Sequence, residues 1–345
     1  MNARLLHCRP PGEPASEVRL GRGLAADLAA ACRDRRVFAL VDAFLADHPA
    51  LDAAWHRHIA RPGDEQKTLS ACEPVLRAMV TAGLDRNGLL IALGGGAVGD
   101  AGGFCASLFM RGIELWQVPT TLLAMVDSAV GGKTAVNLPE GKNLAGTVHP
   151  ASRIVIDIDF AATLPDSEFR SGLAEAVKMA IGVDRELFEL LENEADAVLA
   201  RDPDVLLDVV ERSIRGKIGI VEGDLHEGGR RRLLNLGHTL GHAIEAHQKG
   251  KLAHGLCVAR GLHFALELAH DLDAMSATDL ERCRALLQRF GYERDPLPPT
   301  DDLMTFVKRD KKAAGDGVQF ALPIGIGEAR VEPVTFDRIR RQLAR

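Results

Sequence analysis

Four of the twelve histidines lie in one stretch, LLNLGHTLGHAIEAHQKGKLAHG, at His238, His242, His247 and His254. The four-residue spacing of His238 and His242 places both side chains on one face of a helix. A helix that presents two imidazoles in this way can bind a metal ion, or can offer one ligand beside a neighbouring base. Histidine pairs on ordinary helix surfaces have the same spacing, so the pair alone leaves both interpretations open.

A carboxylate that could complete a metal site lies in SGLAEAVKMAIG, where Glu175 and Lys178 are three residues apart among small and apolar residues. One interpretation is an intrahelical ion pair worth about 0.3 kcal/mol. The other is that Glu175 joins His238 and His254 as a ligand. Two nitrogens and one oxygen leave coordination positions open, as at a catalytic zinc ion. Such an ion polarises hydroxyl or carbonyl groups.

A glycine-rich turn follows an apolar run in LLIALGGGAVGDAGGF, with Gly94, Gly96 and Gly99 in the spacing G-x-G-x-x-G. Glycines let a backbone approach a phosphate closely, and the following helix begins with free N–H groups. The turn does not follow the first strand, and no acidic residue stands clearly about twenty positions later. Asp42, at the end of the first strand, is the better candidate for a ribose hydroxyl. A tight turn without a ligand is the alternative.

The segment 118–150 carries many polar side chains among glycines and prolines. We expect it to be a long irregular loop at the end of a parallel strand, the usual position of a binding site. Two lysines and an asparagine there predict a site for an anion, a phosphate or a carboxylate. Solvated loop lysines are the alternative. The polar residues are Thr120, Thr121, Asp127, Ser128, Lys133, Lys142 and Asn143.

The first half of the chain alternates short β-rich runs with helical patterns, which predicts a parallel sheet covered by helices. We expect strands at 36–41, 89–95, 113–119 and 153–159, with a helix at 69–84. After residue 165 apolar residues recur at helical spacing, interrupted by one strand at 318–323. The pattern predicts an α/β domain at 1–165 and a helical domain at 166–345.

The composition is typical of a soluble globular protein, with 46% hydrophobic and 26% charged residues. The net charge of −6 argues against general nucleic-acid binding. Six scattered cysteines indicate neither a zinc ribbon nor a disulfide framework. No signal peptide or membrane span is indicated, so we expect a cytoplasmic protein with neither a nucleic-acid nor a membrane partner.

Several motifs, in the same order along the chain, resemble those of 3-dehydroquinate synthases. They cover roughly residues 36–330 and are GGGAVGDAGGF, MRGIELWQVPTTLLAMVDSAVGGKTAVNLPEGKN, SGLAEAVK, LLNLGHTLGHAIE and RDKKAAGDGVQFALPIGIGEA. The resemblance implies a Rossmann-like NAD-binding domain, an all-α metal- and substrate-binding domain, an active site in the cleft between them, and a homodimer.

The same resemblance implies roles for individual residues of this sequence. The ligands of Zn²⁺ or Co²⁺ would be Glu175, His238 and His254. The catalytic residues would be Asp127, Lys133, Lys178, Lys217, Glu227, Arg231, Asn235 and His242. Substrate would also contact Arg111 of the partner subunit, Lys142, Asn143, and Lys311 or Lys312. NAD would contact Asp42, Lys67, Gly95, Gly96, Asp100, Thr120, Thr121, Phe160, Thr163 and Leu164.

The implied reaction converts 3-deoxy-D-arabino-heptulosonate 7-phosphate to 3-dehydroquinate and phosphate, a step of the shikimate pathway. It proceeds by transient NAD-dependent oxidation, phosphate elimination, reduction and aldol cyclisation. Alternatives are other sugar phosphate cyclases, of the 2-deoxy-scyllo-inosose synthase or sedoheptulose 7-phosphate type, and metal-dependent polyol dehydrogenases. The substrates of those cyclases lack the carboxylate for which Lys217 and Arg231 are expected. This sequence departs from the usual family pattern at Phe44, Asp64, Leu256 and Arg260.

Overall fold

The computed structural model describes residues 3–309 and 313–344 and divides into two compact units, Met1–Leu164 and Pro165–Arg345. Both units have extensive apolar cores.

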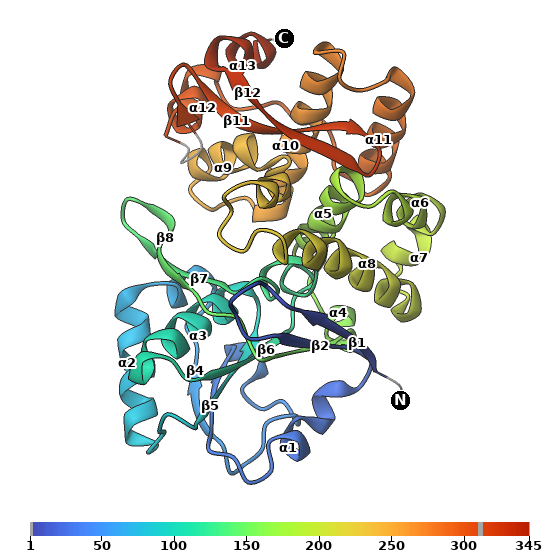
Figure 1. The fold of residues 1–345 in the computed structure, drawn as a ribbon. Helices are drawn as coiled ribbons and strands as arrows, with labels where there is room; N and C mark the ends of the chain where they lie inside the picture. Colours follow the sequence, from blue (N-terminus) through green and yellow to red (C-terminus); the bar gives the residue numbers. More distant parts are fainter. Residues whose placement is uncertain (1–2, 310–312, 345) are drawn as a thin grey trace. The chain divides into compact units, whose positions relative to one another are not determined.

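A seven-stranded sheet forms the centre of the first unit (Figure 1), in the order β1-β2-β9-β6-β5-β3-β4. All neighbours run parallel except β1, which is antiparallel to β2 at one edge. Every residue of β3 and β5 is buried, as expected for inner strands of a parallel sheet covered on both faces. The bounds are β1 Arg4–Cys8, β2 Ser16–Gly21, β3 Val37–Val41, β4 His56–Ile59, β5 Leu89–Gly94, β6 Glu114–Pro119 and β9 Arg153–Asp157.

Two longer helices, α2 (Leu69–Thr81) and α3 (Gly96–Leu108), contact each other, and α3 packs on β5 and β6 (Figure 1). Small residues of α3 permit a close approach to the sheet, because a Cβ on Gly102 would lie only 2.7 Å from the Cβ of Ala92. The remaining helices of this unit are short: α1 Leu28–Ala31 and α4 Asp159–Ala162. The four predicted strands and the helix at 69–84 are confirmed, with ends that differ by a few residues.

The expectation of an irregular loop over 118–150 was wrong for its second half. Strands β7 (Lys133–Leu138) and β8 (Gly141–Val148) form an antiparallel hairpin. Only Thr134 and Val136 of the hairpin are buried, so the alternation of apolar and polar residues that usually marks a strand is weak here.

The second unit is mainly helical. Its central helices α5, α9 and α10 contact one another through α10, and α5 and α10 also contact strand β11. The helices are α5 Asp166–Gly182, α6 Arg185–Asn193, α7 Ala195–Leu199, α8 Pro203–Val221, α9 His238–His247, α10 His254–Asp271, α11 Ala277–Arg289, α12 Thr300–Val307 and α13 Phe336–Leu343.

An antiparallel three-stranded sheet accompanies these helices, so the expected all-α domain also contains β structure. The sequence predicted only the strand at 318–323, which lies within β11. Its partner β12 is mostly exposed or half-buried and lacks an apolar run. The strands are β10 Ala313–Ala314, β11 Gly317–Gly325 and β12 Glu328–Thr335.

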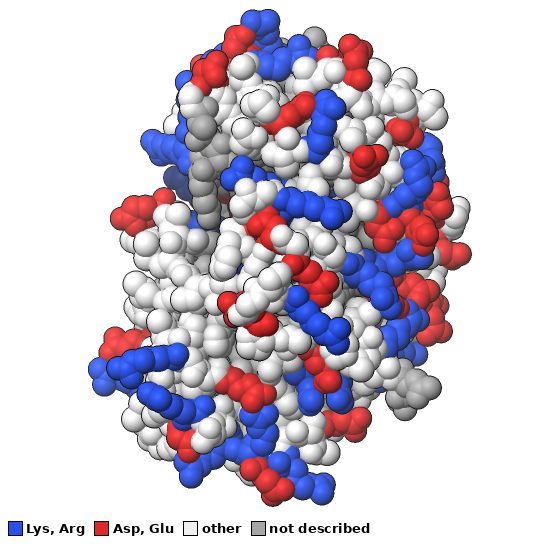
Figure 2. Space-filling view, in the orientation of Figure 1, with Lys and Arg blue, Asp and Glu red and all other residues white. Residues whose placement is uncertain are grey.

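Acidic and basic side chains are interspersed over the face drawn in Figure 2. Among the described residues, no helix has both the length and the apolar character needed to cross a membrane.

Candidate active site

Three helices of the second unit bring the expected metal ligands together. Glu175 lies on α5, His238 begins α9 and His254 begins α10. The Oε1 atom of Glu175 is 3.5 Å from Nε2 of His238 and 3.3 Å from Nε2 of His254. The two imidazoles thus face one carboxylate oxygen.

These separations fit a tetrahedral metal ion. Ligand atoms about 2.1 Å from a tetrahedral zinc ion lie about 3.4 Å from one another. Glu175 is fully buried, and among the described residues neither of its carboxylate oxygens accepts a well-directed hydrogen bond, although Oε2 lies 2.6 Å from Nζ of Lys178. A buried carboxylate without such partners is costly. A cation among these three side chains would satisfy it, so the residues fit the metal that the sequence predicts.

Burial and the neighbouring charges strongly perturb this cluster. Burial opposes ionisation of Glu175, but Lys178 and the two imidazoles hold the pKa of its carboxyl well below the ordinary value. Burial, partly offset by Glu175, lowers the pKa of His238 to about 4. Burial acts in the same direction on His254, but Glu175 and Glu245 outweigh it and raise the pKa of that ring to about 10. The cluster therefore favours an anionic Glu175 and a neutral His238, both suited to metal ligation.

Hydrogen bonds at the far side of each ring orient the two imidazoles. Nδ1 of His238 lies 3.1 Å from the carbonyl oxygen of Leu236, and Nδ1 of His254 lies 3.1 Å from Oε2 of Glu245. His242, one turn after His238, is exposed, and its ring centroid is 5.1 Å from that of His238. The three histidines each offer a nitrogen within 4.8 Å of the others.

Glycines allow α10 to approach its neighbours. A Cβ on Gly255 would lie 1.8 Å from the carbonyl oxygen of Ser171 on α5, and a Cβ on Gly261 would lie 1.9 Å from that of Gly237. Any larger residue at these positions would separate the helices that carry Glu175, His238 and His254.

A polar loop precedes α9 and carries further predicted residues. Asp224 accepts hydrogen bonds from the backbone N–H groups of Gly228, Gly229 and Arg231, and thereby fixes the loop. Within it, Nδ2 of Asn235 donates to Oε1 of Glu227 at 2.6 Å. Asp224 was not among the residues predicted from the sequence; the signal for it was its position shortly before Gly228 and Gly229, whose N–H groups are accessible.

Two cationic side chains in this region are buried. Lys217 on α8 is 5% exposed, and Arg231, which donates to the carbonyl oxygen of Leu225 at 2.5 Å, is 3% exposed. Buried cations are rare unless anionic groups accompany them. The turn 230–235 packs against both α5 and α8, so both residues belong to elements adjacent to the metal cluster.

The predicted cofactor residues in the first unit follow the carboxyl ends of adjacent strands. This is where ligands bind in open parallel sheets. Asp42 follows β3, and a Cβ on Gly94 would lie 3.0 Å from its Cβ, while a Cβ on Gly95 would lie 3.0 Å from Cγ2 of Thr121. The full set is Lys67 after β4, Asp42 after β3, Gly95, Gly96 and Asp100 after β5, Thr120 and Thr121 after β6, and Phe160, Thr163 and Leu164 after β9.

Lys67 connects this edge of the sheet with the β7–β8 hairpin. Its Nζ is 2.6 Å from Oδ2 of Asp100 and 2.6 Å from Oδ1 of Asn143. Lys142 at the hairpin tip forms an exposed ion pair with Asp64 at 2.8 Å. Phe44, beside Asp42, is 95% exposed.

Not all the predicted anion-binding residues lie together. Lys133 is at the base of the hairpin, opposite Val148, whereas Lys142 is near its tip. About four residues of strand, roughly 13 Å, separate the two lysines. The segment forms an extended hairpin instead of the expected compact loop, so the two lysines are attached near its opposite ends. Asp127 is half-buried in the π-helical turn Ala124–Ser128, and Lys311 and Lys312 lie outside the described residues.

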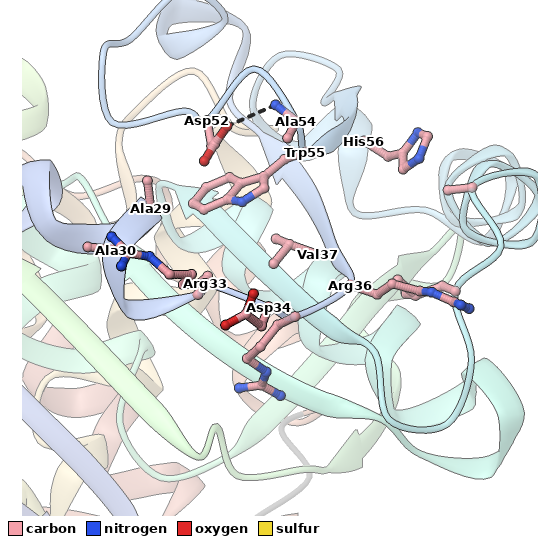
Figure 3. Close-up of a pocket in the computed structure, with 14 residues that line it drawn as sticks. Ala29, Ala30, Arg33, Asp34, Arg36, Val37, Asp52, Ala54, Trp55 and His56 are labelled. Carbon is pink, nitrogen blue, oxygen red and sulfur yellow. Dashed lines mark hydrogen bonds between the residues drawn. The ribbon is translucent and has the colours of Figure 1, made fainter.

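A cavity of about 540 Å³ lies at the other end of the strands, where β3 and β4 begin. Figure 3 shows the indole of Trp55 over this cavity, with Arg33, Asp34 and Asp52 around it. No lining residue belongs to the predicted cofactor set, so the cavity is separate from that site.

Comparisons with known proteins agree with these features. The family model of the 3-dehydroquinate synthase N-terminal domain matches residues 57–171, and that of the C-terminal domain matches residues 172–313. A 3-dehydroquinate synthase of Acidithiobacillus ferrooxidans is 45% identical over 282 residues, which cover 81% of this chain and 78% of the relative. The enzyme of Idiomarina loihiensis is 42% identical over 273 residues, with 79% and 76% covered.

Two solved structures are similar over almost the whole chain. A 2-deoxy-scyllo-inosose synthase complexed with carbaglucose-6-phosphate, NAD⁺ and Co²⁺ has a TM-score of 0.89 at 25% identity, with 99% of both chains covered. The 2-epi-5-epi-valiolone synthase of Streptomyces hygroscopicus, with NAD⁺ and Zn²⁺ bound, has a TM-score of 0.87 at 30% identity, with 98% of both chains covered. The family matches and the close relatives together span most of the sequence, and the chain belongs to the 3-dehydroquinate synthase family.

Proposed function

We propose that this protein is a phosphate-eliminating carbon–oxygen lyase that converts 3-deoxy-D-arabino-heptulosonate 7-phosphate to 3-dehydroquinate and phosphate. The observation that carries this proposal is the convergence of Glu175, His238 and His254 within a chain of this family. The pathway would be the shikimate route to aromatic amino acids, and the location would be the cytoplasm, where the six buried free cysteines would stay reduced.

The cofactors would be NAD and Zn²⁺ or Co²⁺, as in the two solved cyclases. A divalent ion held by Glu175, His238 and His254 would polarise substrate hydroxyl groups and favour loss of a proton from one of them. NAD bound at the carboxyl edge of the sheet would supply reversible hydride transfer at the carbon that bears this hydroxyl, so that no net NADH would form. The carboxyl edge of the sheet supports NAD binding, with Asp42 for a ribose hydroxyl and the start of α3 for the pyrophosphate.

The polar residues of the second unit would bind and orient the substrate. We assign its carboxylate to Lys217 and Arg231, whose burial strengthens an ionic hydrogen bond. His242 would transfer the hydroxyl proton, because imidazole titrates near neutral pH. Glu227 would orient Asn235 through the 2.6 Å hydrogen bond between them. The family resemblance implies roles for five further residues. Catalytic roles would fall to Asp127, Lys133 and Lys178, and contacts with substrate to Lys142 and Asn143.

We further propose a homodimer. Arg111 follows Met110 at the end of α3, and both have left-handed backbone conformations, with φ of 71° and 49°. Beside them lies a groove of about 470 Å³ between α2 and the end of α3. Its apolar residues Val80, Leu108 and Met110 are 66%, 47% and 43% exposed. A second copy of the chain would cover this patch and receive Arg111 in its phosphate site.

The second candidate function is that of another sugar phosphate cyclase, because the two solved neighbours are a 2-deoxy-scyllo-inosose synthase and a 2-epi-5-epi-valiolone synthase. The test incubates the purified protein with the heptulosonate phosphate, Zn²⁺ and a catalytic amount of NAD⁺, and follows the release of phosphate. Stoichiometric release with no net NADH is the expected result. Release only from sedoheptulose 7-phosphate would establish the second candidate, and accumulation of NADH from a polyol would indicate a dehydrogenase.

A further inference from the structure

Glu245 is a buried carboxylate for which the proposed reaction has no assigned role. It lies near the end of α9, seven residues or two helical turns after His238, and therefore on the same face of the helix. Its side chain is only 9% exposed, and Oε2 lies 3.1 Å from Nδ1 of His254 at the start of α10. Acidic side chains are rarely so buried without a specific partner.

The contact determines which nitrogen of His254 is available. An ionised carboxylate only accepts hydrogen bonds, so when the ring carries a single proton, as in a metal-bound histidine, Glu245 keeps that proton on Nδ1. The opposite nitrogen, Nε2, is the atom that faces Oε1 of Glu175 at 3.3 Å. His238 is oriented in the same manner by the carbonyl oxygen of Leu236. Both rings are therefore oriented by an acceptor at Nδ1. The acceptor for His238 is a backbone carbonyl, and the acceptor for His254 is the side chain of Glu245.

The charges of the cluster indicate a second effect. Glu175 and Glu245 are anionic, and Lys178 is cationic, and all three are at least nine-tenths buried. A divalent cation added to these groups leaves a net charge of +1, whereas the same cluster without Glu245 would carry +2. Buried net charge is costly because the interior screens it poorly. Glu245 therefore lowers the electrostatic cost of binding a divalent cation.

We propose that Glu245 is a positioning residue of the metal site, which orients His254 and increases its basicity toward the ion. The inference rests on the metal site proposed above. A carboxylate that accepts the second N–H of a ligand histidine commonly contributes 10- to 100-fold to metal affinity. Glu245 acts through His254 and needs no contact with substrate.

The test measures the dissociation constants of Zn²⁺ and Co²⁺ by chelator competition, in metal-stripped wild type, Glu245→Gln and Glu245→Ala. We expect affinity to fall roughly 10- to 100-fold in Glu245→Ala. Glu245→Gln keeps an acceptor but loses the charge, so a smaller loss is expected. The matched control is Glu281→Gln, which removes a carboxylate that is 68% exposed and paired with Arg284; its affinity should equal that of wild type.

A second readout separates positioning from a purely structural role. In ¹H–¹⁵N spectra of the zinc-loaded protein, the Nδ1–H proton of His254 should be shifted downfield by its hydrogen bond to Glu245 in wild type, and this shift should be lost in Glu245→Ala. Urea unfolding identifies a variant that no longer folds, and Glu245→Gln then carries the comparison. Metal affinities within twofold of wild type for the folded variants would overturn the inference. The assay contains no substrate, so its result is independent of the heptulosonate phosphate assay.

Discussion

The Oε1 atom of Glu175 lies 3.3 Å from Nε2 of His254, although α5 and α10, the helices that carry them, are far apart in the sequence. Within the part of the chain that the structure describes, no hydrogen bond of good geometry reaches this carboxylate, and the glycines of α10 permit the close approach of the helices. A cation bound between the carboxylate and the two imidazoles would explain why the fold brings these groups together.

Replacing Glu175 by Gln should abolish metal-dependent turnover. The change removes the anionic ligand and leaves Lys178 buried without its carboxylate. Metal ions contribute several kcal/mol to transition-state stabilisation, so kcat should fall at least about 10³-fold. The measurement is kcat together with zinc content. His247→Ala is the control, because that ring lies near Asp302 at 3.7 Å, and it should retain metal and activity.

Removal of the metal should destabilise the folded protein. A cation bound by Glu175 adds to the partial stabilisation that Lys178 gives its carboxylate. A ligand present at 100 times its dissociation constant stabilises the folded state by about 2.7 kcal/mol. Thermal melts with zinc and with a chelator should therefore give a higher midpoint with zinc. Glu175→Gln should show no zinc-dependent difference. Equal midpoints for the wild-type protein in both conditions would argue against the site.

Replacing Lys217 by Met should weaken recognition of the substrate carboxylate. A hydrogen bond to a charged group contributes about 1.5–3 kcal/mol, which corresponds to a loss of roughly 10- to 100-fold in kcat/KM for the heptulosonate phosphate. Steady-state kinetics measure this loss. Lys251→Met, at an exposed position, should behave as wild type. An unchanged kcat/KM in Lys217→Met would assign the carboxylate to other residues.

A charge placed in the apolar patch of α2 and α3 should dissociate the dimer. Leu108 is 47% exposed beside the groove, and Leu108→Glu would bury a carboxylate at the proposed interface. Sedimentation velocity should then show a monomer. Leu5→Glu, at a residue that is 53% exposed on β1, is the control and should remain dimeric. A monomeric wild-type protein would remove the basis for the role of Arg111 in the partner subunit.

The ion pair of Glu114 and Arg35 should make stability depend on pH. The hydrogen bond from Arg35, opposed by burial and supported by Ser152 and Trp116, lowers the pKa of Glu114 from 4.5 to about 2. A carboxyl with a depressed pKa stabilises the fold above about pH 4.5, and this contribution is lost as the pH falls toward 2. Wild type should therefore be more stable than Glu114→Gln at pH 7, with the difference vanishing near pH 2.

Urea unfolding at each pH measures the effect of Glu114→Gln. Glu73→Gln removes a carboxylate that is 63% exposed and paired with Arg77, and it should show little pH-dependent difference from wild type. A constant difference between Glu114→Gln and wild type from pH 7 to pH 2 would contradict the assignment.

The sequence was sufficient for those parts of the fold in which burial produces a clear pattern. The inner strands β3, β5, β6 and β9 are almost entirely buried and rich in apolar residues, and α2 has helical spacing. Edge strand β4, His56–Ile59, has no buried residue, and the β7–β8 hairpin buries few side chains. Because so few of their side chains are buried, these elements leave no clear alternation of apolar and polar residues in the sequence.

The site shows the same division. Glu175, His238 and His254 were identified because ligand type, spacing and family motifs agreed. Asp224 and Glu245 were missed because their roles arise from contacts, to the backbone of Gly228 and Gly229 and to the ring of His254. Nothing in the local sequence distinguishes such a carboxylate from an ordinary surface carboxylate, and only the structure shows which groups donate hydrogen bonds to it.

The most direct test of the metal site is anomalous diffraction at the zinc edge from crystals of the active enzyme. We predict one strong peak within about 2.0–2.2 Å of Nε2 of His238, Nε2 of His254 and a carboxylate oxygen of Glu175. A fully active crystal with no peak at these atoms, or with its metal held by other residues, would contradict the account.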